Sequence, residues 1–220
     1  MTAPIEHTDR DPVVRIVEWI KKHQRMLLVA LAVVVLSVAT VMYMRVSKER
    51  RENFAAALIS NARAVASSGN VALAITDLSD LAASHRGTVA AEEAEILLGQ
   101  LRLSEGQADA AVQSLQEYIG RGPSDQFRAA AYGLLAVALE QTSDLGGAAT
   151  AYKNAADAAW YDFLQAQNLL DAGRVLTTLG DTTEAIAIYR RILDDLSETD
   201  MVMEARLRLG ELLRADVDSR

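Results

Sequence analysis

The chain has no cysteine among its 220 residues. Disulfides, thiolate metal ligands, cysteine nucleophiles and a lipoprotein anchor are therefore excluded. Proline and glycine are also scarce, with 3 and 12 residues, and aromatic residues make up only 5%. Hydrophobic residues nevertheless reach 50%, which argues against a disordered chain. Because alanine and leucine, which are abundant here, lose little conformational freedom in helices, the composition predicts an all-α fold.

Patterns typical of a catalytic or metal site are missing as well. His7, His23 and His85 have no partners at metal-ligand spacing, and no glycine-rich phosphate loop follows a predicted strand. Adjacent acidic residues such as Glu92 and Glu93 point about 100° apart on a helix, so they are interpreted as part of a solvated face. We therefore predict a non-enzymatic protein without a cofactor or metal.

The N-terminal part contains one long apolar run. Residues 26–44, MLLVALAVVVLSVATVMYM, carry no charge, glycine or proline. A helix of that length spans roughly 28 Å, close to the ~30 Å hydrocarbon core of a bilayer. The 25 preceding residues and the lack of a small-residue cleavage site favour an uncleaved transmembrane anchor over a signal peptide. A buried core helix is the alternative, although such a helix normally carries a polar stripe.

Charge distribution separates the two parts of the chain but does not orient the anchor. Five basic residues lie before the apolar run and four soon after it, so the positive-inside rule gives no answer. Residues 53–220 carry 13 basic and 24 acidic side chains, a net charge of −11, whereas residues 1–52 carry +3. An acidic domain does not suit nucleic acid, so its partners are predicted to be proteins.

Glycine and proline are absent between Val13 and Ser68. Asp11 and Pro12 supply a helix cap and a favoured first-turn residue, so one helix is expected to begin near Pro12 and continue far along the chain. The apolar residues just before the anchor, beside Lys21 and Lys22, are typical of a short helix at the membrane interface.

The rest of the sequence repeats with a period of 37 residues. A turn residue is followed five positions later by alanine at Gly69/Ala74, Gly106/Ala111, Ser143/Ala148 and Gly180/Ala185. A second series consists of the small residues Ala62, Gly99, Ala136, Gly173 and Gly210, and a third of the larger residues Leu78, Leu115, Tyr152 and Tyr189. Three series with one period predict a solenoid of stacked repeats.

Each repeat is interpreted as two antiparallel helices. Small residues mark close helix crossings, and the turn glycine ends the first helix in a left-handed conformation. Asp181 is then expected to cap the second helix, with Glu184 completing a capping box. Four such pairs over about 48–197 and a closing helix at about 201–215 account for the domain.

The segment 92–125 resembles the tetratricopeptide repeat through Leu98-Gly99, Ala111, Leu115 and Pro123. The resemblance implies a superhelical array of helical hairpins whose first helices line a groove. The expected fold is thus all-α, with one transmembrane helix followed by a tetratricopeptide-like solenoid.

The whole arrangement resembles the ancillary SecYEG translocon subunit family (YfgM-like). It comprises a tail 1–25, an anchor 26–44, a repeat domain 45–215 and a C-terminal tail 216–220; KKHQ before the anchor and Trp160 between repeats also match. The resemblance implies a bacterial inner-membrane protein with a cytoplasmic N-terminus and a periplasmic repeat domain. Its implied partners are the SecYEG translocon, periplasmic chaperones and exported client proteins. An envelope scaffold or regulator in cell division, envelope assembly or stress signalling remains the alternative, and the oligomeric state stays open.

In the tetratricopeptide register, the first helices direct a mixed set of side chains toward the groove. These candidates for protein binding are Ile59, Arg63, Ile96, Gln100, Leu103, Val137, Leu170, Arg174 and Leu207. Apolar residues among polar ones suit varied, partly unfolded clients, and the set does not reproduce the Lys/Asn clamp that binds a peptide carboxylate. Packing of several of these residues between repeats is the alternative.

Overall fold

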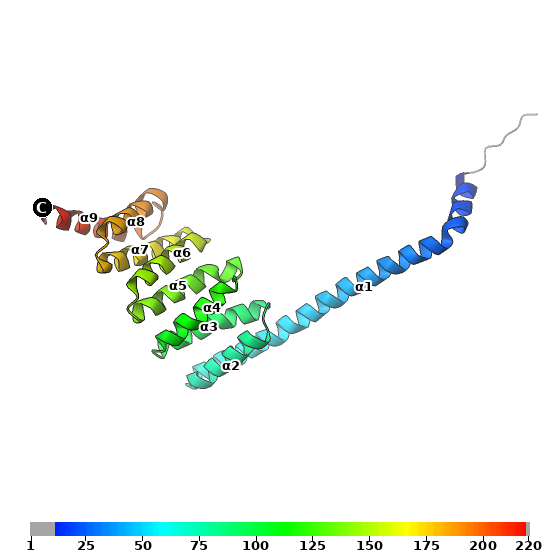
Figure 1. Ribbon diagram of the computed structural model, residues 1–220, viewed down its shortest axis with the longest axis horizontal. Coiled ribbons are helices and arrows are strands. Elements are labelled where there is room, and N and C mark those ends of the chain that lie inside the picture. The colour runs from blue at the N-terminus through cyan, green and yellow to red at the C-terminus, as the bar shows by residue number, and fades with distance from the viewer. Residues whose placement is uncertain (1–11, 219–220) are drawn as a thin grey trace, which may run out of the picture. The chain divides into compact units, whose positions relative to one another are not determined.

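The computed structural model describes residues 12–218, without the side chains of 12–15, 17–18, 20, 27–32 and 215–218. This part of the chain forms the helices α1 (Pro12–Ser67), α2 (Val71–Ser84), α3 (Val89–Ser104), α4 (Ala108–Gly120), α5 (Asp125–Gln141), α6 (Leu145–Ala158), α7 (Asp162–Leu179), α8 (Thr182–Asp195) and α9 (Val202–Asp218) (Figure 1). The chain divides into two compact units, Met1–Arg51 and Glu52–Arg220. Residues 1–11 of the predicted tail 1–25 and residues 219–220 of the predicted tail 216–220 lie outside the described residues.

Helix α1 begins at Pro12, as the Asp11-Pro12 pair predicts, and contains the predicted membrane span 26–44. Among the residues that the structure describes, no helix is long and apolar enough to cross a membrane. The side chains of 27–32, which belong to the predicted span, lie outside the described ones. The membrane span therefore stays a prediction.

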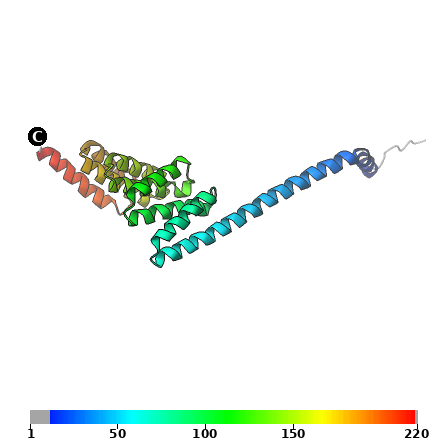
Figure 2. The same ribbon diagram turned by 60° about the horizontal axis from the view of Figure 1, so that its bottom comes forward.

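The second unit is a stack of helical hairpins. Helices that follow each other from α2 to α9 pack together, and the first helices α3 and α5 also touch. Figures 1 and 2 show these helices stacked in chain order, with α9 at the far end from α2. The end of α1 packs with α2 and α3 through Ala55, Ile59 and Ala62. The predicted all-α array of four helix pairs and a closing helix is confirmed, with the closing helix at Val202–Asp218.

Two clusters of buried side chains form the core. One joins α1, α2 and α3, and the other extends from α4 to α9. Alanine is the most frequent buried residue, so the helices approach closely. The largest side chains that are almost fully buried include Leu78, Leu115 and Tyr189, three members of the predicted series of larger residues. The 37-residue period therefore marks the core positions of successive repeats.

The small residues of the second series face these large ones inside the same repeat. A methyl group added at Gly99 would lie 3.1 Å from Leu115 Cδ2, and one added at Gly173 would lie 2.6 Å from Tyr189 Cε1. Glycine is required at 173 because a buried tyrosine ring already occupies the space of a β-carbon. The predicted close crossing between the two helices of a repeat is confirmed, but the residue opposite the glycine is the large one of the third series and not the alanine that the sequence pattern predicts there.

A residue with positive φ ends the first helix of every hairpin. The four residues are Gly69 (91°), Gly106 (72°), Ser143 (67°) and Gly180 (87°). After each of them the next backbone N–H donates back across the helix end, as Asp144 N does to Leu139 O at 2.9 Å. This is the Schellman arrangement, which satisfies carbonyls that the helix end would leave free. Ser143 is the one non-glycine residue with positive φ in residues 12–218, so it carries strain that the three glycines avoid.

Replacing Ser143 with glycine is therefore expected to stabilise the protein by about 0.5–1 kcal/mol. Glycine removes the cost of the left-handed conformation, and its greater freedom in the unfolded chain cancels part of that gain. Urea unfolding followed by circular dichroism measures the change. The matched control is Ser104→Gly at the right-handed end of α3, which should lose stability because glycine disfavours helix. Equal losses from both substitutions would contradict a strained Ser143.

One half of the predicted capping box is present. Asp181 Oδ1 accepts a hydrogen bond from Glu184 N at 3.1 Å, which confirms the cap. The reciprocal half is wrong, because Asp181 N donates to Leu176 O at 2.9 Å as part of the preceding helix end. Glu184 instead forms an ion pair with Lys153 on α6. This carboxylate therefore connects two neighbouring repeats.

Candidate functional site

The predicted groove residues differ widely in exposure. Arg63, Gln100, Arg174 and Leu207 are exposed, whereas Ile96, Leu103, Val137 and Leu170 are half-buried. Ile59 is only 2% exposed and belongs to the core cluster of α1, α2 and α3. Its side chain therefore packs between helices and offers no surface to a partner. For Ile59 the packing alternative is the correct interpretation.

Three of the half-buried groove residues pack against the core on one side and are exposed on the other. Leu103, Val137 and Leu170 lie on α3, α5 and α7, and all three pack against the larger core cluster. Their exposed edges lie on the first helices of consecutive repeats. Part of each of these side chains is therefore used for packing, and only the remainder is available to a partner.

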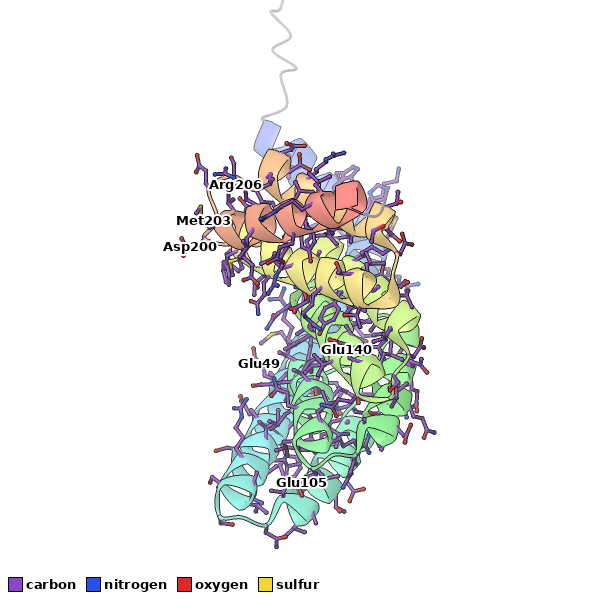
Figure 3. All side chains as sticks on the ribbon, turned by 90° about the vertical axis from the view of Figure 1, so that its left-hand side faces the viewer. Glu49, Glu105, Glu140, Asp200, Met203 and Arg206 are labelled. Atoms are coloured by element: carbon purple, nitrogen blue, oxygen red, sulfur yellow. The ribbon has the colours of Figure 1, made fainter. Side chains whose placement is uncertain are left out.

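Leu170 and Arg174 come together in a pocket of about 360 Å³ between α7 and α9. Its walls are Gln167, Leu170, Asp171 and Arg174 from α7, Tyr189 from α8, and Asp200, Met201, Glu204 and Arg208 from the start of α9 and the segment before it. In Figure 3, Asp200, Met203 and Arg206 mark the beginning of α9 beside this end of the stack. This pocket is the best-defined part of the predicted groove.

Arg174 is held in place by carboxylates on two helices. Its Nη1 and Nη2 donate to Glu140 Oε2 at 2.7 Å and to Glu140 Oε1 at 2.9 Å, and Nη2 also donates to Asp171 Oδ1 at 3.2 Å. Tyr152 OH donates to Glu140 Oε1 at 2.7 Å. A bidentate pair fixes the planar guanidinium more firmly than a single contact. The network thus joins α5, α6 and α7 at the edge of the pocket.

These contacts shift the protonation equilibria of the two acids in opposite directions. The hydrogen bonds from Arg174 lower the pKa of Glu140 in spite of its partial burial. Burial is the larger effect on Asp171 and raises its pKa, although Arg174 opposes the change. Glu140 also raises the pKa of Arg174, which keeps its positive charge. The pocket therefore retains a fixed cation beside an acid that ionises less readily than usual.

The other predicted arginine also bridges adjacent first helices. Arg63 on α1 forms an ion pair with Glu93 on α3. Glu92, next to it, accepts hydrogen bonds from Tyr118 OH at 2.9 Å and from Ser124 N at 2.8 Å. The interpretation of Glu92 and Glu93 as a merely solvated face is therefore wrong, because both carboxylates connect repeats.

Sequence reasoning missed Gln167, Asp171, Glu204 and Arg208, which all line the pocket. The 37-residue period could have identified these residues. Gln167 and Glu204 are 37 residues apart, as are Asp171 and Arg208. Equivalent positions of two successive first helices thus face each other across the pocket. Extending the register to neighbouring positions would have found them.

Comparison with known proteins identifies the fold and family. A solved crystal structure of the nearly identical TPR-like repeats of a Podosopora anserina protein, described as a kinesin light chain, superposes with a TM-score of 0.56. The two chains are 15% identical, with 74% of this chain and 86% of that chain covered, so the likeness shows a shared fold. No match was found among curated proteins. The profile of the tetratricopeptide repeat-like domain, a kind of domain that typically mediates protein–protein binding and is generally non-catalytic, matches residues 18–213. The chain therefore belongs to the tetratricopeptide repeat-like domain family.

Proposed function

We propose that the chain is a membrane-tethered, non-catalytic adaptor that holds segments of exported proteins at the Sec translocon. The observation that carries the proposal is the pocket between α7 and α9, which is lined by equivalent positions of two first helices. Tetratricopeptide-like domains bind proteins, and this pocket supplies a surface on which a segment of another chain can rest.

The lining of the pocket suits an extended, partly unfolded segment. Leu170 and Met201 offer apolar contact, and a methionine side chain adapts to differently shaped residues. Arg174 and Arg208 supply donors for the carbonyls of a bound backbone, and Asp171 supplies an acceptor for its N–H groups. Arg208 makes only long contacts of 3.4 Å with Glu204 and Glu211, so a ligand can replace them at little cost.

The tether is supported by the side chains of α1. Its large apolar residues from Val33 to Met44 are more than half exposed, which suits a lipid environment. The hydroxyls of Ser37 and Thr40 each donate to the carbonyl four residues earlier at 2.8 Å, so neither needs water. The resemblance to the SecYEG ancillary family supports the orientation, with 1–25 cytoplasmic and 45–220 periplasmic in a bacterial inner membrane.

Site-specific photocrosslinking in intact cells tests the proposal. A photoreactive amino acid replaces Gln167, an exposed residue of the pocket, and the control position is Gln116, which is exposed on α4. Position 167 should yield several-fold more crosslinked protein than position 116, because only residue 167 lines the pocket. Mass spectrometry of the products should identify exported proteins and translocon subunits.

Equal labelling from the two positions would overturn the groove assignment. Products consisting only of cytoplasmic proteins would overturn the orientation and the export role together. A single division or signalling protein, without translocon subunits, would establish the scaffold alternative in place of the adaptor.

A further inference from the structure

Three aromatic side chains are exposed together in the connection between α6 and α7 and the first turn of α7. Trp160, Tyr161 and Phe163 are 69%, 62% and 53% exposed, and they are three of the chain's eleven aromatic residues. Burial of such large apolar side chains is favourable by roughly 2–3 kcal/mol each, so a fold gains nothing by leaving three of them together in water. Clustered exposure of this kind marks an interaction surface. We refer to these three residues as the aromatic patch.

The local backbone holds the patch outward. Tyr161 occupies the cap position of α7 in an extended conformation, with φ −118° and ψ 132°. Its carbonyl oxygen accepts hydrogen bonds from Leu164 N and Gln165 N, both at 3.0 Å. The rings of Tyr161 and Phe163 stack with their centroids 5.9 Å apart and an angle of 26° between their planes. Tyr161 and Phe163 are therefore positioned by the start of α7.

A hollow of about 490 Å³ lies between the patch and the connection from α8 to α9. Besides the three aromatic residues, it is lined by Asp162, Glu198, Thr199 and Asp200. No lysine or arginine lines it, and among the described residues the carboxylates of Asp162, Glu198 and Asp200 make no ion pair. Three aromatic side chains are thus bordered by three negative charges without a cation.

We propose that this hollow is a docking site for a basic segment of a partner protein, which places an arginine or lysine side chain against the aromatic patch. A cation over an aromatic face is attracted by the negative charge of the ring face, most strongly for tryptophan. The carboxylates of Asp162, Glu198 and Asp200 complement the same charge, and the guanidinium of arginine also stacks on flat rings. The hollow differs from the pocket between α7 and α9, which is lined by two arginines, and only Asp200 lines both. The site goes beyond the proposed function, because it adds a second, charge-selective contact to the same domain.

Tryptophan fluorescence of the full-length, detergent-solubilised protein tests the site. In a Trp19→Phe background Trp160 is the only tryptophan, so its emission reports on the patch directly. The probe is a synthetic peptide of alternating arginine and serine, and the control peptide alternates glutamate and serine. We expect saturable changes in emission with the arginine peptide alone, and weaker binding as salt is raised. Glu198→Gln should weaken the binding roughly fivefold.

Glu105→Gln at the end of α3 is the matched control, since Glu105 is exposed and distant in sequence. It should leave the binding constant unchanged. An equal response to the acidic peptide, or unaltered binding by Glu198→Gln, would overturn the proposal. Light scattering could instead show that the protein is a dimer and that Trp160→Ala makes it a monomer. Together with no fluorescence response to the arginine peptide, this result would assign the patch to contact with a second copy of the chain. Neither result bears on the pocket between α7 and α9, because Glu198 and Trp160 do not line it.

Discussion

Replacing Ala185 with leucine is expected to lower the free energy of unfolding by about 1–3 kcal/mol, the usual cost of overpacking a core. Ala185 lies on α8 and is 0% exposed. It belongs to the larger core cluster together with Ala172 of α7 and Ala205 of α9, which are also fully buried. The added carbon atoms have no free volume between helices spaced for alanine. The helices must therefore separate, and their contacts weaken.

The same substitution at Ala187 is the matched control, because Ala187 is exposed on the same helix. Ala187→Leu should change stability by less than about 0.5 kcal/mol. Hydrogen exchange measured by mass spectrometry should show faster exchange of Ala185→Leu in α7, α8 and α9, since each repeat depends on its neighbours. Unchanged protection of these helices would mean that Ala185 does not occupy the close crossing.

Replacing Gly173 with alanine is expected to destabilise the protein by about 1–2 kcal/mol, although alanine is the better helix former. The new methyl carbon would lie 2.6 Å from Cε1 and 2.7 Å from Cζ of Tyr189. That ring is 1% exposed and packed in the core, so moving it toward the pocket that it lines would cost core contacts. The gain in helix propensity of about 1 kcal/mol offsets only part of the overpacking.

Gly210 provides the control at the equivalent position one repeat later. A methyl group added there meets no atom within 4 Å, because no second helix follows α9 among the described residues. Gly210→Ala should therefore raise the free energy of unfolding by about 0.5–1 kcal/mol. Thermal unfolding of the two variants should show shifts of opposite sign. A stabilised Gly173→Ala variant would contradict the contact with Tyr189.

The sequence predicts the repeats well because their spacing reflects contacts inside each hairpin. A small residue and the large residue it faces both belong to one repeat, as Gly173 and Tyr189 do, so both recur with the same period, although the period alone does not show that they face each other. The turn positions are predictable for the same reason. Even Ser143, which breaks the glycine pattern, has the left-handed backbone that its place in the series indicates.

Exposure along the groove is less predictable, because it depends on what the next repeat covers. Ile59, Ile96, Leu170 and Leu207 occupy one register, yet Ile59 is 2% exposed and Leu207 is 55% exposed. Ile59 is enclosed by α2 and α3, whereas Leu207 lies on the closing helix. The capping box is incomplete for a local reason, since Asp181 N already donates to Leu176 O, and Glu184 pairs with Lys153 of the preceding repeat. Neighbours that are distant in sequence therefore determine the exposure along the groove and the partner of Glu184.

The division of the core into two clusters affects how the array responds to binding. No buried residue is shared between the cluster of α1, α2 and α3 and the cluster of α4 to α9. Strain in closely packed side chains is passed on through direct contact. A segment that enters or leaves the pocket between α7 and α9 therefore perturbs the C-terminal cluster first. The hairpin of α1 and α2 is reached last, through α3, whose Gly99 faces Leu115 of the C-terminal cluster and whose Leu103 packs against it.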